Sequence, residues 1–183
     1  MKIVLKIILK ILGWKIGGIT EIQHDKYLVV VAPHTSNWDF IYGILFAYQL
    51  PFKIHFLAKS QLFTFAYGWF FRVLGGIPVD RTKKNDLVSQ VVDIIDQKDK
   101  IVVGIAPEGT RKRTEKWKTG FYYIAREANI PIALAFIDYK TKTIGIDSIF
   151  FTSDNKENDL KYIESIYSKY QAKYPMMFNN KIS

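Results

Sequence analysis

Residues 27–48 of this 183-residue chain read YLVVVAPHTSNWDFIYGILFAY, and this stretch decides the fold. Its first part, residues 27–31, is an apolar run rich in β-branched residues, which is typical of a buried strand. Residues 40–48 are predicted to be helical, and Ser36 and Asn37 ahead of them are residue types that cap helix N-termini. The stretch therefore predicts a strand that leads directly into a helix, a joint where α/β proteins often place their chemistry.

His34 follows the predicted strand, and Asp39 comes five residues later on the first helical turn. A carboxylate in this position can accept the Nδ1 hydrogen of the histidine, fix its tautomer and leave Nε2 free as a base. The chain has no cysteine and no Gly-x-Ser-x-Gly motif, so we expect the nucleophile to be a substrate hydroxyl that His34 deprotonates. The alternative is a capping aspartate beside an incidental histidine, and this short pattern alone does not choose between the two.

The rest of the chain alternates strands with helices. Further strands are predicted over residues 53–59, 77–79, 101–106, 130–137 and 142–146, the last as an edge strand that pairs with the one before it. Further helices are predicted over residues 83–97, 120–129 and 160–174, and the tail from Pro175 is expected to fray. This order predicts an α/β fold with helices flanking a mixed central sheet. His34, Arg81 and Glu108 all follow apolar runs, so we expect them to meet at one edge of that sheet.

The composition narrows the class of protein. Hydrophobic residues make up 49% of the chain, enough for one domain with a sizeable core. The 26 Lys and Arg residues outnumber the 17 Asp and Glu residues, and the net charge of +9 indicates an anionic partner such as nucleic acid, an anionic membrane or a phosphorylated substrate. The absence of cysteine excludes disulfides and thiolate catalysis. A metal site made of His34, Asp39 and Glu108 lacks a second nearby histidine, so no metal is expected.

Two apolar segments indicate a lipid surface. Residues 1–12 are apolar apart from Lys2, Lys6 and Lys10, which recur every four residues and so share one helix face. This pattern predicts an amphipathic helix in a membrane interface, with packing on its own domain as the alternative. Residues 62–74 are the most aromatic stretch and form either a core helix or one that meets lipid. We expect residues 1–18 to form a membrane-interface helix and residues 19–183 to form a single catalytic domain.

The loop from Pro107 to Lys118 is strongly basic. Arg111 offers a planar fork suited to a phosphate, and Gly109 allows the backbone to approach a ligand closely. A solvated basic loop is the alternative, but the proximity expected for Arg81 and His34 favours a phosphate site. We interpret Glu108 as an orienting carboxylate and not as a second base.

Four motifs in this order resemble the glycerolipid acyltransferase family, of the 1-acylglycerol-3-phosphate O-acyltransferase type. They are His-x4-Asp at residues 34–39, Gly-x4-Arg at residues 76–81, Glu-Gly-Thr-Arg at residues 108–111, and an apolar block around Pro131. The resemblance covers residues 27–138, which is most of the chain.

The resemblance implies a role for each matching residue. His34 is implied as the general base, and Asp39 as the residue that orients it. The remaining matches are Arg81 and Arg111 as holders of the acceptor phosphate, Gly109 and Thr110 as residues that shape the site, Glu108 as the acidic residue of that loop, and Pro131 as part of the acyl or acceptor pocket. The implied reaction passes an acyl group directly to the acceptor hydroxyl, without an acyl-enzyme.

The resemblance also implies partners. An acyl thioester of acyl carrier protein or coenzyme A is the expected co-substrate, with no cofactor besides it, and 1-acylglycerol-3-phosphate is the expected lysophospholipid acceptor in phospholipid biosynthesis. The protein is expected on the cytoplasmic face of the cell inner membrane, as a peripheral protein. Lys112 stands where the family often has a small residue, and the chain is short for the family, so another lysolipid or hydroxyl-lipid acceptor stays open.

A non-enzymatic protein that binds anionic membranes or nucleic acid is the alternative from another class. It rests on the net charge and on the N-terminal segment. The aromatic residues lie in apolar runs and not on a basic strand surface, so no nucleic-acid partner is expected.

Overall fold

The computed structural model describes every residue of the chain except residues 1, 20, 52, 65, 81–86 and 183. Its strands are β1 (Lys15–Gly18), β2 (Lys26–Ala32), β3 (Ile54–Lys59), β4 (Gly76–Val79), β5 (Ile101–Ile105), β6 (Ile132–Asp138) and β7 (Thr143–Phe150). Its α-helices are α1 (Lys2–Ile11), α2 (Asn37–Ala47), α3 (Gly68–Val73), α4 (Leu87–Asp96), α5 (Gly120–Glu127) and α6 (Lys156–Tyr167), and two short 3-10 helices cover Ser60–Phe63 and Pro175–Met177.

The strands form one mixed sheet in the order β1-β7-β6-β2-β5-β3-β4. Neighbouring strands run parallel except β6 and β7, which are antiparallel. Strand β2 lies at the centre, between β5 and β6, and its residues 27–30 are fully buried. Both faces of such a strand are covered, which explains why its sequence is a continuous apolar run and does not alternate with polar residues.

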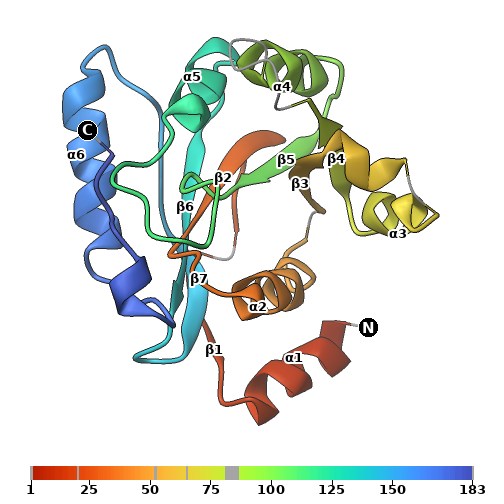
Figure 1. Cartoon of the computed structure of the whole chain (residues 1–183), viewed down its shortest axis with the longest axis vertical. Coiled ribbons are helices and arrows are strands. Elements are labelled where there is room, and N and C mark those ends of the chain that lie inside the picture. The colour runs from red at the N-terminus through yellow and green to blue at the C-terminus, as the bar shows by residue number, and fades with distance from the viewer. Residues whose placement is uncertain (1, 20, 52, 65, 81–86, 183) are drawn as a thin grey trace.

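Helices cover the two faces of the sheet and form two separate cores (Figure 1). Leu28 and Val30 of β2 point into the core made with α4, α5 and α6. Tyr27 and Val29, one position away on the strand, point into the opposite core, which α1 and α2 supply. The predicted α/β fold with helices flanking a mixed sheet is therefore confirmed.

The N-terminal segment corrects two expectations. Residues 15–18 are not part of the helix expected over residues 1–18. They form strand β1, which pairs with β7 in parallel. Strand β7 is therefore not an edge strand, and residues 15–18 belong to the same sheet as the other strands. Gly18 permits this pairing, because a Cβ at that position would lie 2.0 Å from the carbonyl oxygen of Ile146. A Cβ on Gly145 would likewise lie 1.9 Å from the carbonyl oxygen of Gly17.

Three other elements differ from their predicted bounds. The aromatic stretch 62–74 is not one helix, because its described part contains the end of a 3-10 helix at Phe63 and the separate helix α3. Helix α6 ends at Tyr167 and not near residue 174. The tail does not fray, because Ile182 is buried and the indole Nε1 of Trp117 donates a hydrogen bond to the carbonyl of Asn179 at 2.5 Å. Of the helix predicted over residues 83–97, residues 83–86 lie outside the described residues.

Candidate active site

The loop between β2 and α2 carries the first site residues. Helix α2 begins with a capping box, in which the hydroxyl of Ser36 accepts the Trp38 backbone N–H at 3.2 Å. The side chain of Asp39 accepts in return the Ser36 backbone N–H at 2.7 Å. Because this box needs Asp39 as the third helical residue, it fixes the carboxylate beside the end of β2.

Asp39 is buried and fully engaged. Its Oδ2 accepts the backbone N–H of Thr35 at 2.7 Å, in addition to that of Ser36, and lies 3.5 Å from Nδ1 of His34. Its Oδ1 accepts the hydroxyl of Tyr139 at 2.6 Å. Burial acts to raise the pKa of Asp39, but the hydrogen bonds from His34, Tyr139 and the Ser36 amide outweigh burial and hold the pKa below its ordinary value. The carboxylate therefore stays charged beside the imidazole.

The imidazole of His34 has one nitrogen facing Asp39 and one available to a substrate. The side chain is 20% exposed, so a ligand can reach it from solvent. Within the described part of the chain, no group hydrogen-bonds Nε2. A carboxylate at Nδ1 with an open Nε2 is the arrangement of a histidine general base. The contact predicted between His34 and Asp39 from their spacing is present.

The side chain of Glu108 lies against the loop between β2 and α2 that carries His34. It follows β5, it is 5% exposed, and its Oε1 accepts the backbone N–H of His34 at 3.0 Å. Its Oε2 is buried without a hydrogen-bond partner in the described structure. Burial raises the pKa of Glu108 to about 8, against the effect of the His34 amide, and the charge of Asp39 raises it further. Near pH 7 the carboxyl is therefore mostly neutral, which leaves Asp39 as the negative charge next to His34.

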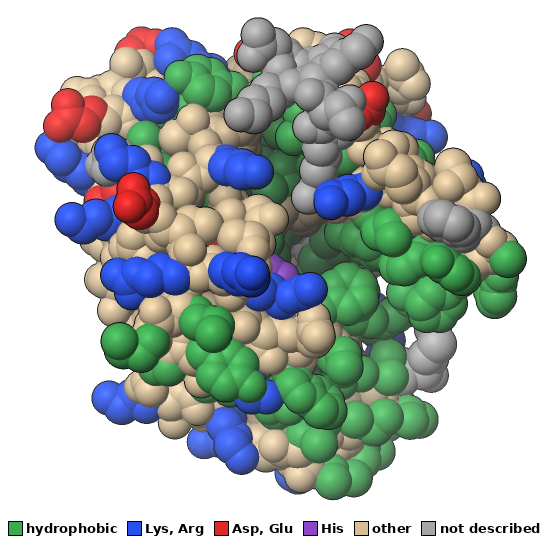
Figure 2. All heavy atoms as spheres, viewed as in Figure 1, with side chains coloured by type: hydrophobic (Ala, Val, Ile, Leu, Met, Phe, Trp, Pro, Cys, Tyr) green, Lys and Arg blue, Asp and Glu red, His purple; other side chains and the backbone are tan. Residues whose placement is uncertain are grey.

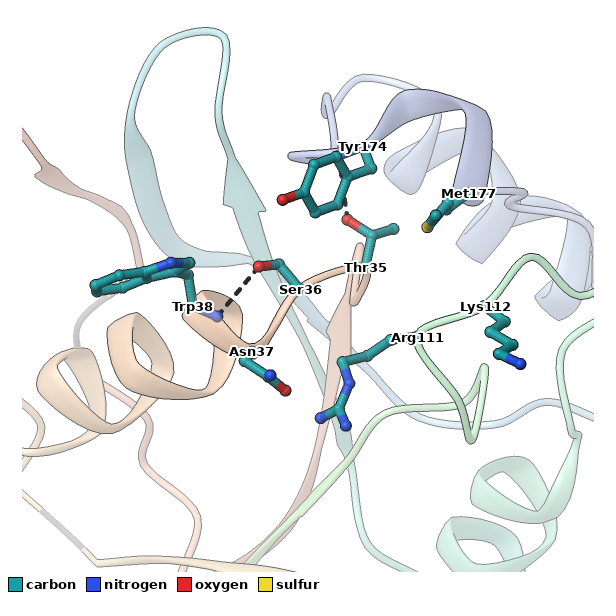
Figure 3. A pocket seen from close by; sticks show the side chains of 8 residues that line it. All are labelled: Thr35, Ser36, Asn37, Trp38, Arg111, Lys112, Tyr174 and Met177. Carbon is teal, nitrogen blue, oxygen red and sulfur yellow. Dashed lines mark hydrogen bonds between the residues drawn. The ribbon is translucent and has the colours of Figure 1, made fainter.

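A pocket of about 420 Å³ opens beside this loop (Figure 3). Its lining comes from three places: the start of α2 with Thr35, Ser36, Asn37 and Trp38, the loop after β5 with Arg111 and Lys112, and the C-terminal segment with Tyr174 and Met177. Among the described residues, no carboxylate pairs with Arg111, so its guanidinium is available to an anion. The positive charge and the pocket size both suit a phosphorylated small molecule.

The remaining predicted site residues divide into three groups. Gly109, with φ of +67°, and the exposed Thr110 lie in the loop between Glu108 and Arg111, and Thr110 Oγ1 accepts the Lys112 backbone N–H at 3.2 Å. Arg81 lies outside the described residues. Pro131 lies far from His34, because its carbonyl accepts the N–H of Leu28 near the start of β2.

Strand β2 separates Pro131 from the site. The five residues from Leu28 to Ala32 span about 13 Å, and His34 lies beyond them. The structure therefore brings together His34, Asp39, Glu108 and the loop of Arg111, but not Pro131. Among the described residues, no group of three or more His, Asp or Glu side chains is placed to hold a metal ion.

Sequence reasoning missed three residues of the site. Tyr139 bonds Asp39 from 100 positions away, directly after β6, and Tyr174 and Met177 line the pocket from the tail. The position of Tyr139 carried a usable signal, since it ends a strand parallel to β2, and the carboxyl ends of parallel strands meet at the same edge. Tyr174 and Met177 carried no such signal.

Large apolar side chains are exposed on α1, α2, α3 and the segments that flank them. In Figure 2 they gather at the lower right, where Figure 1 places these helices. The exposed fractions reach 75% at Ile3, 77% at Ile11 and 65% at Trp69. The others are Val4, Ile7, Ile8, Leu12, Trp38, Phe40, Ile41, Tyr48, Leu62, Tyr67, Phe70 and Val73. We call this set of residues the apolar face. None of the described helices is both long enough and apolar enough to cross a bilayer.

Comparison with known proteins identifies the family to which the chain is similar. The family model "Acyltransferase" matches residues 14–136. A 1-acyl-sn-glycerol-3-phosphate acyltransferase of Streptococcus pneumoniae is 29% identical over 131 residues, which cover 67% of this chain and 48% of that protein. A 1-acyl-sn-glycerol-3-phosphate acyltransferase of Bacillus subtilis is 30% identical over 135 residues, 72% of this chain and 66% of that protein. The chain thus spans about half to two thirds of these relatives. No solved structure shows a significant match to this chain.

Proposed function

The chain belongs to the acyltransferase family, and from this premise we propose that it moves a fatty acyl group from an acyl thioester to the hydroxyl of 1-acylglycerol-3-phosphate. The observation that carries the proposal is the His34 imidazole, held by a charged Asp39 at Nδ1 and open at Nε2. The names of the two curated relatives support the acceptor. The donor is a thioester of acyl carrier protein or coenzyme A.

The chemistry needs one base and no enzyme nucleophile. Nε2 of His34 takes the proton of the acceptor hydroxyl as its oxygen attacks the thioester carbonyl carbon. The tetrahedral intermediate then collapses, the carbon–sulfur bond breaks, and the thiolate takes a proton from the imidazolium. The products are a diacylated lipid and a free thiol. Asp39 stabilises the imidazolium formed in the first step, and its fixed hydrogen bonds hold it in place for this task.

The acceptor phosphate is assigned to the pocket of Arg111. A guanidinium can bind two phosphate oxygens at once, and Lys112 adds a second positive charge. The pocket borders residues 35–38, which directly follow His34, so a bound phosphate brings the nearby hydroxyl of the same small molecule toward the base. Arg81 is proposed as a further phosphate ligand from the match of its motif, with Gly109, Thr110 and Glu108 shaping the loop.

The apolar face provides the contact with the membrane in this proposal. Both the acceptor and the product are lipids, and an exposed apolar surface of this extent is typical of a membrane or protein interface. On α1, Leu9 is buried against the domain, whereas most of the other side chains are exposed, both the apolar ones and the lysines at positions 2, 6 and 10. Trp69 and Tyr67 are residue types that favour the headgroup level. The protein would thus sit peripherally on the cytoplasmic face of the inner membrane.

The test is acyl transfer from acyl carrier protein and coenzyme A thioesters to a panel of lysolipids. The wild type is expected to acylate 1-acylglycerol-3-phosphate, and His34→Ala is expected to lose at least about 10³-fold in rate. His24→Ala is the matched control, because His24 is exposed and its ring contacts Phe151. Full activity in a folded His34→Ala variant would refute the proposed base. Transfer only to another lysolipid would retain the reaction and change the acceptor.

A further inference from the structure

The C-terminal segment crosses the entrance of the site. We call residues 174–182 the C-terminal strap. The Tyr174 backbone N–H donates to Oγ1 of Thr35 at 3.3 Å, so the strap is attached to the loop that carries His34. The guanidinium of Arg113 donates to the Met176 carbonyl at 3.1 Å. The strap is therefore tied both to the loop of the base and to the loop of the phosphate site.

The far end of the strap is anchored as firmly. Trp117, which is buried, donates its backbone N–H to the Lys181 carbonyl at 2.9 Å and its indole N–H to the Asn179 carbonyl. The side-chain amide of Asn179 donates to the backbone carbonyls of Thr114 and Glu115. Because both ends are held, residues 174–177 have a defined position over the pocket.

Two strap side chains form one wall of the pocket. Tyr174 and Met177 lie above Asn37 and Arg111 in Figure 3, so they face the polar floor across the space. Met176, between them in the chain, does not line the pocket and is 83% exposed. The wall is thus made of one aromatic ring and one flexible thioether, with the charged groups opposite.

The strap lies outside the part of the chain that the family shares. The family model matches residues 14–136, which include the base, Asp39 and Arg111, whereas the strap begins 38 positions after that match ends. The groups expected to perform the reaction therefore lie inside the residues that the family model matches, and this wall of the pocket lies outside them.

From these observations we infer that the C-terminal strap determines which phosphorylated headgroup the enzyme accepts. The inference rests on the proposed function. A volume of about 420 Å³ exceeds what a bare phosphate monoester fills, so the volume alone does not select the headgroup. Tyr174 and Met177 form the wall opposite Arg111, so a group attached to a phosphate on the guanidinium must pack against the Tyr174 ring and the Met177 thioether. Pocket walls of this kind discriminate substrates by about 10-fold or more for each small group added or removed.

The experiment compares two acceptors with the same acyl chain and the same thioester donor. One is 1-acylglycerol-3-phosphate, and the other is 1-acylglycerol-3-phosphoglycerol, which carries an extra glycerol on the phosphate. We expect the wild type to prefer the first. Met177→Ala and Tyr174→Ala are expected to reduce this preference, measured as the ratio of kcat/KM values, by about 10-fold each. Tyr174→Phe keeps the ring and is expected to keep the ratio.

Met176→Ala is the matched control, because it removes the same side chain one position away from the wall. Its ratio is expected to stay within about twofold of the wild type, as is usual for an exposed side chain. An unchanged ratio in both wall variants, with wild-type activity, would overturn the role of the strap while leaving the proposed function intact. A changed KM for the thioester alone would also overturn it, because the wall would then face the donor. A wild type inactive with every lysolipid would refute the proposed function and this inference with it.

Discussion

At the N-terminal end of α2, polar side chains are buried and hydrogen-bonded, whereas on the outer surfaces of α1, α2 and α3 large apolar side chains are exposed. Asp39 accepts hydrogen bonds from two backbone amides and Tyr139, and Glu108 accepts the amide of His34. On the apolar face, Ile3 is 75% exposed and Ile11 is 77% exposed. Both regions reverse the usual distribution of polar and apolar groups.

The two regions tolerate change differently. The polar cluster, which consists of His34, Asp39, Glu108 and Tyr139, depends on single atoms at fixed distances, so the loss of one hydroxyl alters the charge of Asp39 beside the base. The apolar face depends on total area, so each residue contributes a share and none is decisive. The comparison predicts that changes to the polar cluster alter the rate constant and its pH dependence, while changes to the apolar face alter binding to lipid.

Among the changes that test this comparison, the largest effect is expected on the apolar face when several residues change together. We expect the combined variant Ile3→Ser, Ile11→Ser and Trp69→Ser to bind vesicles containing phosphatidylglycerol about 100-fold more weakly or worse. The reason is that each side chain of this size contributes roughly 1.5–3 kcal/mol when it is transferred from water into lipid. Cosedimentation with vesicles measures the effect. The value of kcat with a short-chain, monomeric acceptor is expected to stay unchanged, which separates this face from the active site.

Phe151→Ser is the control for that variant, because Phe151 is 52% exposed but lies outside the apolar face. It is expected to bind vesicles like the wild type. Equal binding by the triple variant would show that the face does not contact lipid. A fall in kcat with the monomeric acceptor would show that the two regions are not independent.

A smaller effect is expected for Tyr139→Phe, which removes one hydroxyl from the polar cluster. The Tyr139 hydroxyl is one of the hydrogen bonds that lower the pKa of Asp39, so its loss raises that pKa. Asp39 then becomes protonated at a higher pH, and the acid limb of the kcat profile moves upward. We expect kcat at neutral pH to fall by about 10-fold, as is usual for a hydrogen bond to a charged group.

Tyr42→Phe is the matched control for that variant. The Tyr42 ring lies 6.3 Å from the Tyr139 ring, but no hydrogen bond joins Tyr42 to Asp39 in the described structure. Its acid limb is expected to match the wild type. If Tyr139→Phe lowered kcat without moving the acid limb, Tyr139 would support the packing of the site and not the charge of Asp39.

The polar cluster also shows which parts of the site sequence could predict. The contact of His34 with Asp39 and the cap at Ser36 are local, because strand end, cap and first helical turn are fixed by residues a few positions apart. Tyr139 could be suspected from its position after a predicted strand, but its hydrogen bond to Asp39 depends on the placement of β6 beside β2, which no local pattern encodes. The strap is harder still, because its course depends on hydrogen bonds to loops more than 60 positions earlier.

The fold shows the same division. Apolar periodicity located the central strands and the helices α4 and α5, because each buries its own side chains. Strand β1 was missed because two of its four residues are glycines, which usually indicate a break. These glycines allow the backbone of β1 to approach β7 closely, and this requirement can be recognised only when the partner strand is known. The membrane-interface role of residues 1–18 remains a prediction.

The smallest effect concerns Glu108 and appears in stability. Its pKa is about 8 in the folded protein and 4.5 as the ordinary value, so between these pH values the folded state binds more protons than the unfolded state. The free energy of unfolding of the wild type therefore falls as pH rises through this window, by at most about 1.4 kcal/mol per pH unit from this residue. Glu108→Gln keeps an oxygen for the His34 amide and removes the titration. We expect the stability of Glu108→Gln relative to the wild type to increase from pH 5 to pH 8 and to level off above it.

Urea unfolding of both proteins across that pH range measures the difference, in which all other titrating groups cancel. Parallel curves would mean that Glu108 ionises near its ordinary pKa and that two negative charges flank His34. The polar cluster would then contain two buried, charged carboxylates, Asp39 and Glu108, and would differ still more from the uncharged apolar face. A rising difference would instead identify Glu108 as a neutral hydrogen-bond acceptor that holds the His34 backbone while leaving the charge to Asp39.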